Sequence, residues 1–142
     1  MTDKVMWGFQ THFSVGESII DPEEGVKLAA DAGYTHVALA DTMSVSALIS
    51  ATKQGKKSGV KVIPGVTLRV KNPYIEWGYL YPRVYAKTEA AMKRLYALLS
   101  DTEKDRDWHY VTLEKLCDAL ADDMMVTSGI VYGLYGSSLQ VM

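Results

Sequence analysis

The chain has 142 residues, of which 48% are hydrophobic and 23% are charged, and its formal net charge is −2. This composition indicates a soluble globular domain with its own core, and it excludes a disordered chain or one that is strongly basic throughout. One cysteine excludes an internal disulfide framework, and no apolar run reaches the roughly 18 residues of a membrane span. We therefore expect a cytoplasmic protein without a membrane partner.

The first half of the chain alternates between strand and helix patterns. An apolar run predicts a strand over residues 5–9, and an Asp-Pro-Glu-Glu start predicts a helix over residues 21–32 that ends at the following glycine. HVALA at residues 36–40 predicts a buried strand. Ser44 is expected to cap a helix that runs to about residue 58 and ends at a glycine.

The alternation continues through the middle of the chain. Residues 60–70 predict a strand interrupted at Pro64-Gly65, and residues 80–86 predict another, placed at an edge by Pro82. Thr88 is expected to cap a helix to about residue 99. The apolar positions of this helix at helical spacing are Met92, Leu95, Tyr96 and Leu99.

The last part carries shorter patterns. Residues 100–107 are expected to be a polar linker, and a short helix is predicted from Thr112, with Cys117 on its apolar, buried face. Residues 124–127 predict a buried strand, whereas the segment 128–142 receives no assignment. Strands alternating with helices predict an α/β fold with a mostly parallel sheet.

In such a fold, functional residues lie at the carboxyl ends of the strands. The polar side chains there are Gln10, His12, Glu17, Asp41, Thr42 and Thr67. His12 is either a metal ligand or, as we favour, a solvated side chain. Asp41 is either catalytic or, as we favour, a cap that accepts backbone N–H bonds in the following turn. His36 and His109 are expected to be structural or exposed.

A basic segment lies between Asp41 and Glu76, where the chain has no acidic residue. Its members are Lys53, Lys56, Lys57, Lys61, Arg69 and Lys71. These charges suit a nucleic-acid or partner surface. The alternative is a solvated helix face with acids nearby in space.

Three stretches of the chain resemble one family. Residues 13–70 (FSVGESIIDPEEG through VIPGVTLRV) resemble the N-terminal PHP (polymerase and histidinol phosphatase) domain of bacterial family C replicative DNA polymerases. Residues 86–100 and 106–129 resemble later stretches of the same domain, in the same order. The resemblance implies one PHP-like domain over 1–142. It would be the N-terminal part of a distorted βα barrel, with about five mostly parallel strands and helices outside.

The resemblance also shows where the metal ligands of the family would fall. The family motif His-x-His falls on Gly8-Phe9-Gln10, Asp-Gly on Glu17-Ser18, Asp-His on Asp41-Thr42, a glutamate on Thr67, and later ligands near Tyr81 and on Ile130. Of these positions, only Glu17 and Asp41 keep an acidic group. The resemblance therefore implies a degenerate site that holds no metal and carries no catalytic residue.

Three functions follow from this resemblance. The first is a non-catalytic PHP-like domain of a bacterial or phage DNA polymerase III alpha-type replicase. It would be a scaffold and docking surface for the polymerase remainder and the proofreading exonuclease, and a fragment or half-barrel would cover its open faces with a partner or a second copy. The second is a small metal-dependent phosphoesterase that uses His12, Glu17 and Asp41 with one Zn or Mn ion. The third is a stand-alone phage protein that mimics the host PHP domain.

Overall fold

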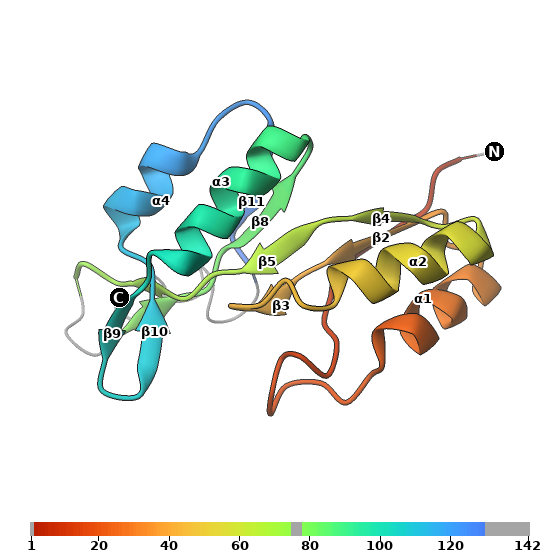
Figure 1. The fold of residues 1–142 in the computed structure, drawn as a ribbon, viewed down its shortest axis with the longest axis horizontal. Coiled ribbons are helices and arrows are strands. Elements are labelled where there is room, and N and C mark those ends of the chain that lie inside the picture. Colours follow the sequence, from red (N-terminus) through yellow and green to blue (C-terminus); the bar gives the residue numbers. More distant parts are fainter. Residues whose placement is uncertain (1, 75–77, 130–142) are drawn as a thin grey trace. The chain divides into compact units, whose positions relative to one another are not determined.

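The computed structural model describes residues 2–74 and 78–129, which fall into two compact units divided between Val66 and Thr67 (Figure 1). The described residues form eleven short strands, whereas the sequence predicts about five. Part of the difference arises because Pro64 and Pro82 each divide one predicted strand into two. No helix among the described residues has the length and apolar character needed to cross a bilayer. The expectation of one domain over 1–142 stays a prediction.

The first unit is built on a parallel sheet of β1 (Val5–Phe9), β2 (His36–Leu39) and β4 (Lys61–Ile63), in the order β1-β2-β4. The helices α1 (Pro22–Asp31) and α2 (Leu48–Ser58) connect these strands and pack against each other over the sheet (Figure 1). The predicted β-α-β pattern is therefore confirmed in this unit. The crossovers place the polar loops after β1 and β2 at the same edge of the sheet.

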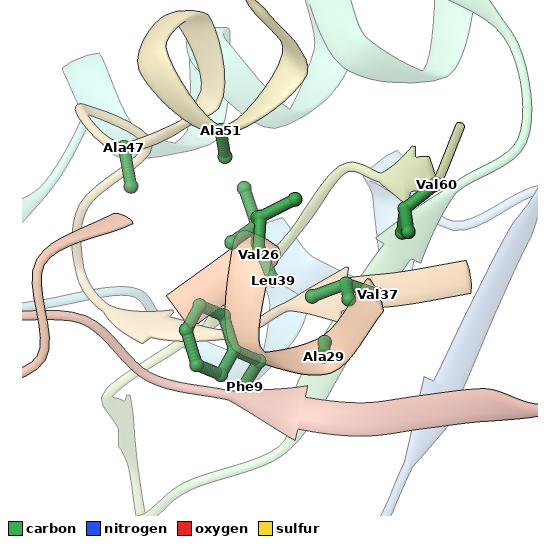
Figure 2. Close-up of a cluster of buried hydrophobic side chains, with 8 residues drawn as sticks. All are labelled: Phe9, Val26, Ala29, Val37, Leu39, Ala47, Ala51 and Val60. Carbon is green, nitrogen blue, oxygen red and sulfur yellow. The ribbon is translucent and has the colours of Figure 1, made fainter. Parts of the chain in front are cut away.

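Buried apolar side chains fill the space between these helices and the sheet (Figure 2). The cluster consists of Phe9, Val26, Ala29, Val37, Leu39, Ala47, Ala51 and Val60. Val26 and Val37 have no exposed surface. Burying each of them contributes about 1.5–3 kcal/mol.

The two helices of this unit differ in how well their N-caps were predicted from the sequence. Asp21 accepts hydrogen bonds from the backbone N–H groups of Glu23 and Glu24 at 2.9 and 3.1 Å, so the predicted N-cap is confirmed. The prediction that Ser44 caps α2 is wrong. Its hydroxyl accepts from the Ser46 N–H in a preceding turn, and the helix begins after Ala47.

Two short strands extend the predicted strand ends. β3 (Asp41–Thr42) follows β2 after one residue, and β5 (Gly65–Thr67) follows β4 after Pro64. The interruption predicted at Pro64-Gly65 is therefore confirmed.

Two strand pairs of the second unit are antiparallel. β6 (Val70–Lys71) pairs with β7 (Tyr79–Leu80), and β8 (Arg83–Ala86) pairs with β11 (Met124–Thr127). The α/β class is confirmed, but these pairs differ from the mostly parallel arrangement expected.

The segment expected to be a linker is instead part of a hairpin. β9 (Glu103–Asp105) pairs with β10 (Trp108–Tyr110), and Arg106 takes a positive φ of 56° at the turn. The hydrogen bond from the Tyr110 hydroxyl to Glu103 at 3.1 Å joins the two strands.

Two helices complete this unit. α3 (Glu89–Ser100) has Thr88 as its N-cap, as predicted, but it buries Leu98 and leaves Tyr96 exposed. α4 (Leu113–Ala119) buries only Leu116. The expectation that Cys117 is a core residue is wrong, because its side chain is exposed.

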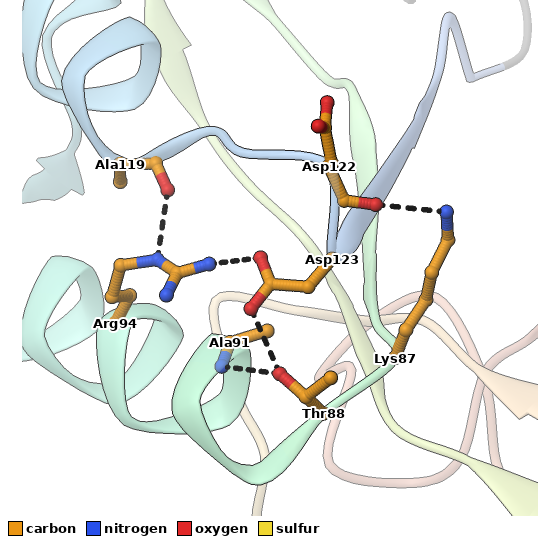
Figure 3. A network of polar contacts seen from close by, with 7 residues as sticks. All are labelled: Lys87, Thr88, Ala91, Arg94, Ala119, Asp122 and Asp123. Atoms are coloured by element: carbon orange, nitrogen blue, oxygen red, sulfur yellow. Dashed lines mark hydrogen bonds and ion pairs between the residues drawn. The ribbon is translucent and has the colours of Figure 1, made fainter.

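A polar network ties α3 to the segment before β11 (Figure 3). The Arg94 guanidinium pairs with Asp123 and also donates to the Ala119 carbonyl at 3.1 Å. The Thr88 hydroxyl donates to Asp123 at 2.8 Å and accepts from the Ala91 N–H. The Thr88 hydrogen bond, followed by Arg94, lowers the pKa of Asp123.

Candidate functional site

Three of the strand-end residues meet around one carboxylate in the first unit. Gln10 Nε2 donates to Glu17 Oε2 at 2.8 Å, and Thr42 Oγ1 lies 2.9 and 3.0 Å from the two oxygens of the same carboxylate. Gln10 Nε2 and Thr42 Oγ1 are also 3.4 Å apart. The loop after β1 and the strand β3 supply these groups, so the sequence identified residues that do converge.

Asp41 lies beside this cluster and faces the interior of the loop. It is only 1% exposed. Its Oδ1 accepts from the Thr11 N–H at 2.6 Å and from Ser14 Oγ at 2.7 Å, and its Oδ2 accepts from Thr11 Oγ1 at 2.7 Å. Asp41 therefore accepts a backbone N–H bond, as the capping interpretation predicts. However, the turn that Asp41 stabilises is that of residues 11–14, and not the turn that follows Asp41 in the chain.

Thr11 and Ser14 were not singled out from the sequence, although both are fully buried polar residues. Ser14 Oγ also accepts from the Thr42 N–H at 3.0 Å, so it links the loop to β3. The only signal in the sequence was a threonine and a serine in a turn beside a strand end, which many loops share. The loop geometry is what makes them partners of Asp41.

His12 takes no part in this network. Its backbone N–H donates to the Ile20 carbonyl at 2.8 Å, while its exposed ring packs edge-on against Phe13 at 4.7 Å between centroids. His36 contacts the Thr35 hydroxyl, and His109 lies in β10 within 3.2 Å of the Thr102 hydroxyl.

The side chains present do not fit the metal cluster whose ligand positions the family motif marks. Metal sites of this kind need several imidazole and carboxylate ligands. In residues 2–74 and 78–129, no three His, Cys, Asp or Glu side chains are placed to hold one ion. The carboxylates of Glu17 and Asp41 accept hydrogen bonds from amide, hydroxyl and N–H donors instead.

The hollow beside this site is small. It is lined by Leu39, Asp41, Ser44, Val45, Ala47, Leu48, Pro64 and Gly65, and it encloses no space in which a water molecule would fit. Ligand pockets are usually about 300–1,000 Å³. This hollow is therefore no enclosed binding site for a small molecule.

The outer side of the loop is apolar. Val15 and Ile19 are 90% and 96% exposed, and Phe13 and Ile20 are also exposed. We call these four residues the apolar loop surface. Backbone hydrogen bonds such as Ser14 N–H to Thr11 O and Glu17 N–H to Ser14 O hold the loop in one shape. Its apolar side chains are therefore presented by a preorganised segment.

Two further sequence-predicted positions lie in the second unit. Thr67 is buried at the end of β5, and Tyr81 OH lies 3.4 Å from Arg69 Nε in the second unit. Ile130 lies outside the described residues.

The basic segment is divided between the two units. Lys53, Lys56, Lys57 and Lys61 are exposed on α2 and at the start of β4. In the second unit, Arg69 donates to the His109 carbonyl at 2.9 Å and its guanidinium stacks 4.5 Å from the Trp108 ring centroid.

Lys71 pairs with Asp105 at 3.0 Å, and this hydrogen bond raises the pKa of the lysine. Lys71 therefore has an acid beside it, although it lies in the strand β6 and not on a helix face. Whether the segment as a whole is a binding surface or a solvated helix face stays a prediction.

Comparison with known proteins places this site in a family. The PHP domain matches residues 9–140. The DNA polymerase III subunit alpha of Yersinia pestis is 43% identical over 61 residues, which is 43% of this chain and 5% of that protein. The error-prone DNA polymerase of Idiomarina loihiensis is 35% identical over 60 residues, which is 42% of this chain and 6% of that protein. The chain thus spans a small fraction of the polymerases it matches.

Two solved structures share the fold. A protein described as a metal-dependent phosphoesterase from Bifidobacterium adolescentis has a TM-score of 0.55 at 18% identity, covering 72% of this chain and 34% of its own. An amidohydrolase from Chromobacterium violaceum has the same score and identity, covering 68% and 32%. These likenesses support the barrel-type α/β fold expected from the sequence. With nearly the whole length matched, this chain belongs to the PHP domain family.

Proposed function

We propose that this chain is a non-catalytic PHP domain that acts as a scaffold and docking surface in bacterial or phage DNA replication. The observation that carries the proposal is the cluster in which Gln10 and Thr42 donate hydrogen bonds to Glu17. These residues stand where the family resemblance places metal ligands.

The chemistry of this cluster supports a structural role. One carboxylate, one amide nitrogen and one hydroxyl are a poor set for Zn²⁺ or Mn²⁺, because the amide nitrogen offers hydrogens instead of a lone pair. The hydrogen bonds satisfy Glu17 without a cation. We infer that these hydrogen bonds hold the loop after β1 against β3. In a metal-binding member of the family, an ion coordinated by both segments would do this.

The relatives give the context of replication. The similarity to DNA polymerase III subunit alpha and to an error-prone polymerase suggests that the chain works beside the remainder of a replicase and its proofreading exonuclease, in the cytoplasm. The apolar loop surface is the expected contact, because exposed apolar side chains on a preorganised loop suit a protein partner. A second copy of the chain is the alternative occupant.

The test has two arms on the full chain. Hydrolysis of bis(p-nitrophenyl) phosphate with added Mn²⁺ or Zn²⁺ is expected to stay at the level of the blank. Sedimentation of the chain with the exonuclease subunit of the same organism is expected to show a complex that Val15→Asp with Ile19→Asp weakens. Leu28→Asp is the matched control, because Leu28 is exposed on α1 outside the loop.

Either arm can overturn the proposal. Metal-dependent turnover would favour the phosphoesterase alternative with His12, Glu17 and Asp41. A complex that is equally weakened by Leu28→Asp, or that does not form, would contradict docking through the loop. Self-association without the exonuclease, lost in the loop variant, would assign the surface to a second copy.

A further inference from the structure

We propose that the apolar loop surface binds a protein whose contact surface is apolar at its centre and carries lysine or arginine side chains around that centre. This inference rests on the proposed docking function, because it concerns the same surface. It adds the chemistry that the partner must have.

Acidic side chains accompany the apolar ones. The loop between β1 and α1 and the first turn of α1 carry four exposed acids, which are Glu17, Asp21, Glu23 and Glu24. We call these four residues the acidic rim. Between Lys4 and Lys27 the chain has no lysine or arginine. The loop therefore combines exposed apolar side chains with acidic groups and with no basic side chain of either type.

The fold keeps the acidic rim close to the apolar side chains. The His12 N–H donates to the Ile20 carbonyl at 2.8 Å, which joins the two ends of the loop. Glu17 lies two residues from both Val15 and Ile19, and Asp21 directly follows Ile20 in the chain. In Figure 1 the loop projects beyond the start of α1, so a partner can reach it.

The protein does not neutralise the acidic rim. In residues 2–74 and 78–129, none of the four carboxylates forms an ion pair. Glu17 accepts hydrogen bonds from neutral side chains, and Asp21 accepts them from two backbone N–H groups. These bonds leave the negative charges in place, so basic groups of a partner are attracted to them.

Helix capping explains only part of this arrangement. Asp21 is the N-cap of α1, and Glu23 and Glu24 lie in its first turn, where negative charge is favourable. Neither role applies to Glu17, which precedes the helix. Capping also gives no reason for side chains as apolar as Val15 and Ile19 to be almost fully exposed in the same loop.

The sign of the charge identifies the occupant. Nucleic acid and an anionic bilayer are both negative, so the acidic rim would repel them. Two copies of the chain in a symmetric contact through this loop would place one acidic rim against the other. A protein with an apolar centre and a basic surround matches both parts of the surface, because it buries the apolar side chains and pairs the carboxylates.

A pair of designed peptides tests this chemistry on the full chain. The first is a labelled amphipathic helix with leucines on one face and lysines on the other, and the second has glutamate in place of every lysine. Fluorescence anisotropy measures the Kd of each peptide for the chain. We expect the leucine–lysine peptide to bind with a Kd about tenfold lower than that of the leucine–glutamate peptide.

Two variants separate the charged and apolar parts of the surface. Glu23→Gln with Glu24→Gln removes two exposed charges and is expected to weaken binding of the leucine–lysine peptide about fivefold. Val15→Ser with Ile19→Ser removes apolar contact without adding charge and is expected to weaken it about tenfold.

A matched control separates the loop from the net charge of the protein. Glu114→Gln with Asp118→Asn removes two exposed acids from α4 and changes the net charge by the same amount. This control is expected to leave the affinity for the leucine–lysine peptide unchanged. Urea unfolding checks that all three variants remain folded.

The outcomes separate this inference from the proposed function. Equal Kd values for the two peptides, equal losses in the Glu23, Glu24 variant and the α4 control, or no loss in the Val15, Ile19 variant would each overturn the inference. If the exonuclease complex still formed through the loop, the proposed function would stand without it. Preference for the leucine–lysine peptide without an exonuclease complex would support the partner chemistry and contradict the exonuclease as the partner.

Discussion

Replacing Asp41 with alanine tests the role of the buried carboxylate most sharply. The side chain lies at the start of β3 and holds the turn of residues 11–14 through the Thr11 N–H, the Thr11 hydroxyl and the Ser14 hydroxyl. Alanine removes the common acceptor of all three donors. Two of the donors can rotate, but the Thr11 N–H is fixed by the backbone and lies in a residue with no exposed surface.

The expected loss of stability follows from these contacts. Hydrogen bonds to a charged group contribute about 1.5–3 kcal/mol each, and a buried donor left without an acceptor costs about 1–3 kcal/mol. Since the hydroxyls recover part of their bonding, we expect Asp41→Ala to lower the free energy of unfolding by about 3–5 kcal/mol. Domains have about 5–15 kcal/mol in total, so the change is severe.

Urea unfolding measures the effect. With a slope of about 2 kcal/mol per molar urea, the midpoint is expected to fall by about 2 M. Asp41→Asn keeps the size and one acceptor oxygen and is expected to lose less. Asp31→Ala is the control, because that residue is exposed at the end of α1. A urea midpoint of Asp41→Ala within error of the wild type would show that the carboxylate does not hold the turn. Stabilisation of the wild type by Mn²⁺, abolished in Asp41→Asn, would instead make Asp41 a metal ligand.

Three further changes have defined outcomes. Gln10→His combined with Thr42→His adds two imidazoles beside the existing carboxylate, and calorimetry is expected to detect one Zn²⁺ per chain; no gain over wild type would mean that the groups do not converge. Gly55→Ala places a Cβ 2.5 Å from the Val60 carbonyl oxygen, so it is expected to lower the free energy of unfolding by about 1–3 kcal/mol despite alanine's better helix propensity, and a higher melting temperature would contradict this. Asp123→Asn is expected to destabilise the protein at pH 7. Because the folded pKa of Asp123 lies below the ordinary value of an aspartate, the carboxylate's contribution to stability is complete above that ordinary value and is lost as the pH falls through the folded one. The urea midpoints of wild type and variant should therefore converge in acid, and a gap that stays constant with pH would be inconsistent with this.

Much of the first unit follows from local sequence. Asp21 before Pro22, and the apolar run at residues 36–40, carry their signals within a few residues, and the structure has the corresponding cap and strand. Ser44 misled the prediction because a serine caps turns as readily as helices. Here its hydroxyl accepts a hydrogen bond from the Ser46 N–H, and the helix begins only at Leu48.

The second unit depends on contacts between distant segments. β8 and β11 are about forty residues apart in the chain, and nothing local states that they run antiparallel. The hairpin at residues 103–110 was missed because its first strand, Glu-Lys-Asp, is charged and lacks the apolar alternation of a strand. Cys117 shows the limit of a helical pattern in a seven-residue helix, of which only Leu116 is buried.

Only part of the candidate site could be predicted from the sequence. Gln10, Glu17 and Thr42 were identified because they follow the carboxyl ends of parallel strands. These ends meet at one edge of the sheet, independently of the conformation of the loops. It could not identify Thr11 and Ser14, since their pairing with a buried carboxylate depends on the fold of the whole loop between β1 and α1. Residue type at a position was predictable, whereas the direction of each hydrogen bond was not.

We propose that Glu17 is held by hydrogen bonds and belongs to no metal site. Calorimetric titration of the full chain with Mn²⁺ and with Zn²⁺, beside the variant Glu17→Gln, tests this proposal. We expect only heats of dilution for both proteins and no metal-induced rise in the melting temperature. Saturable binding of one or more ions per chain that Glu17→Gln removes would contradict it.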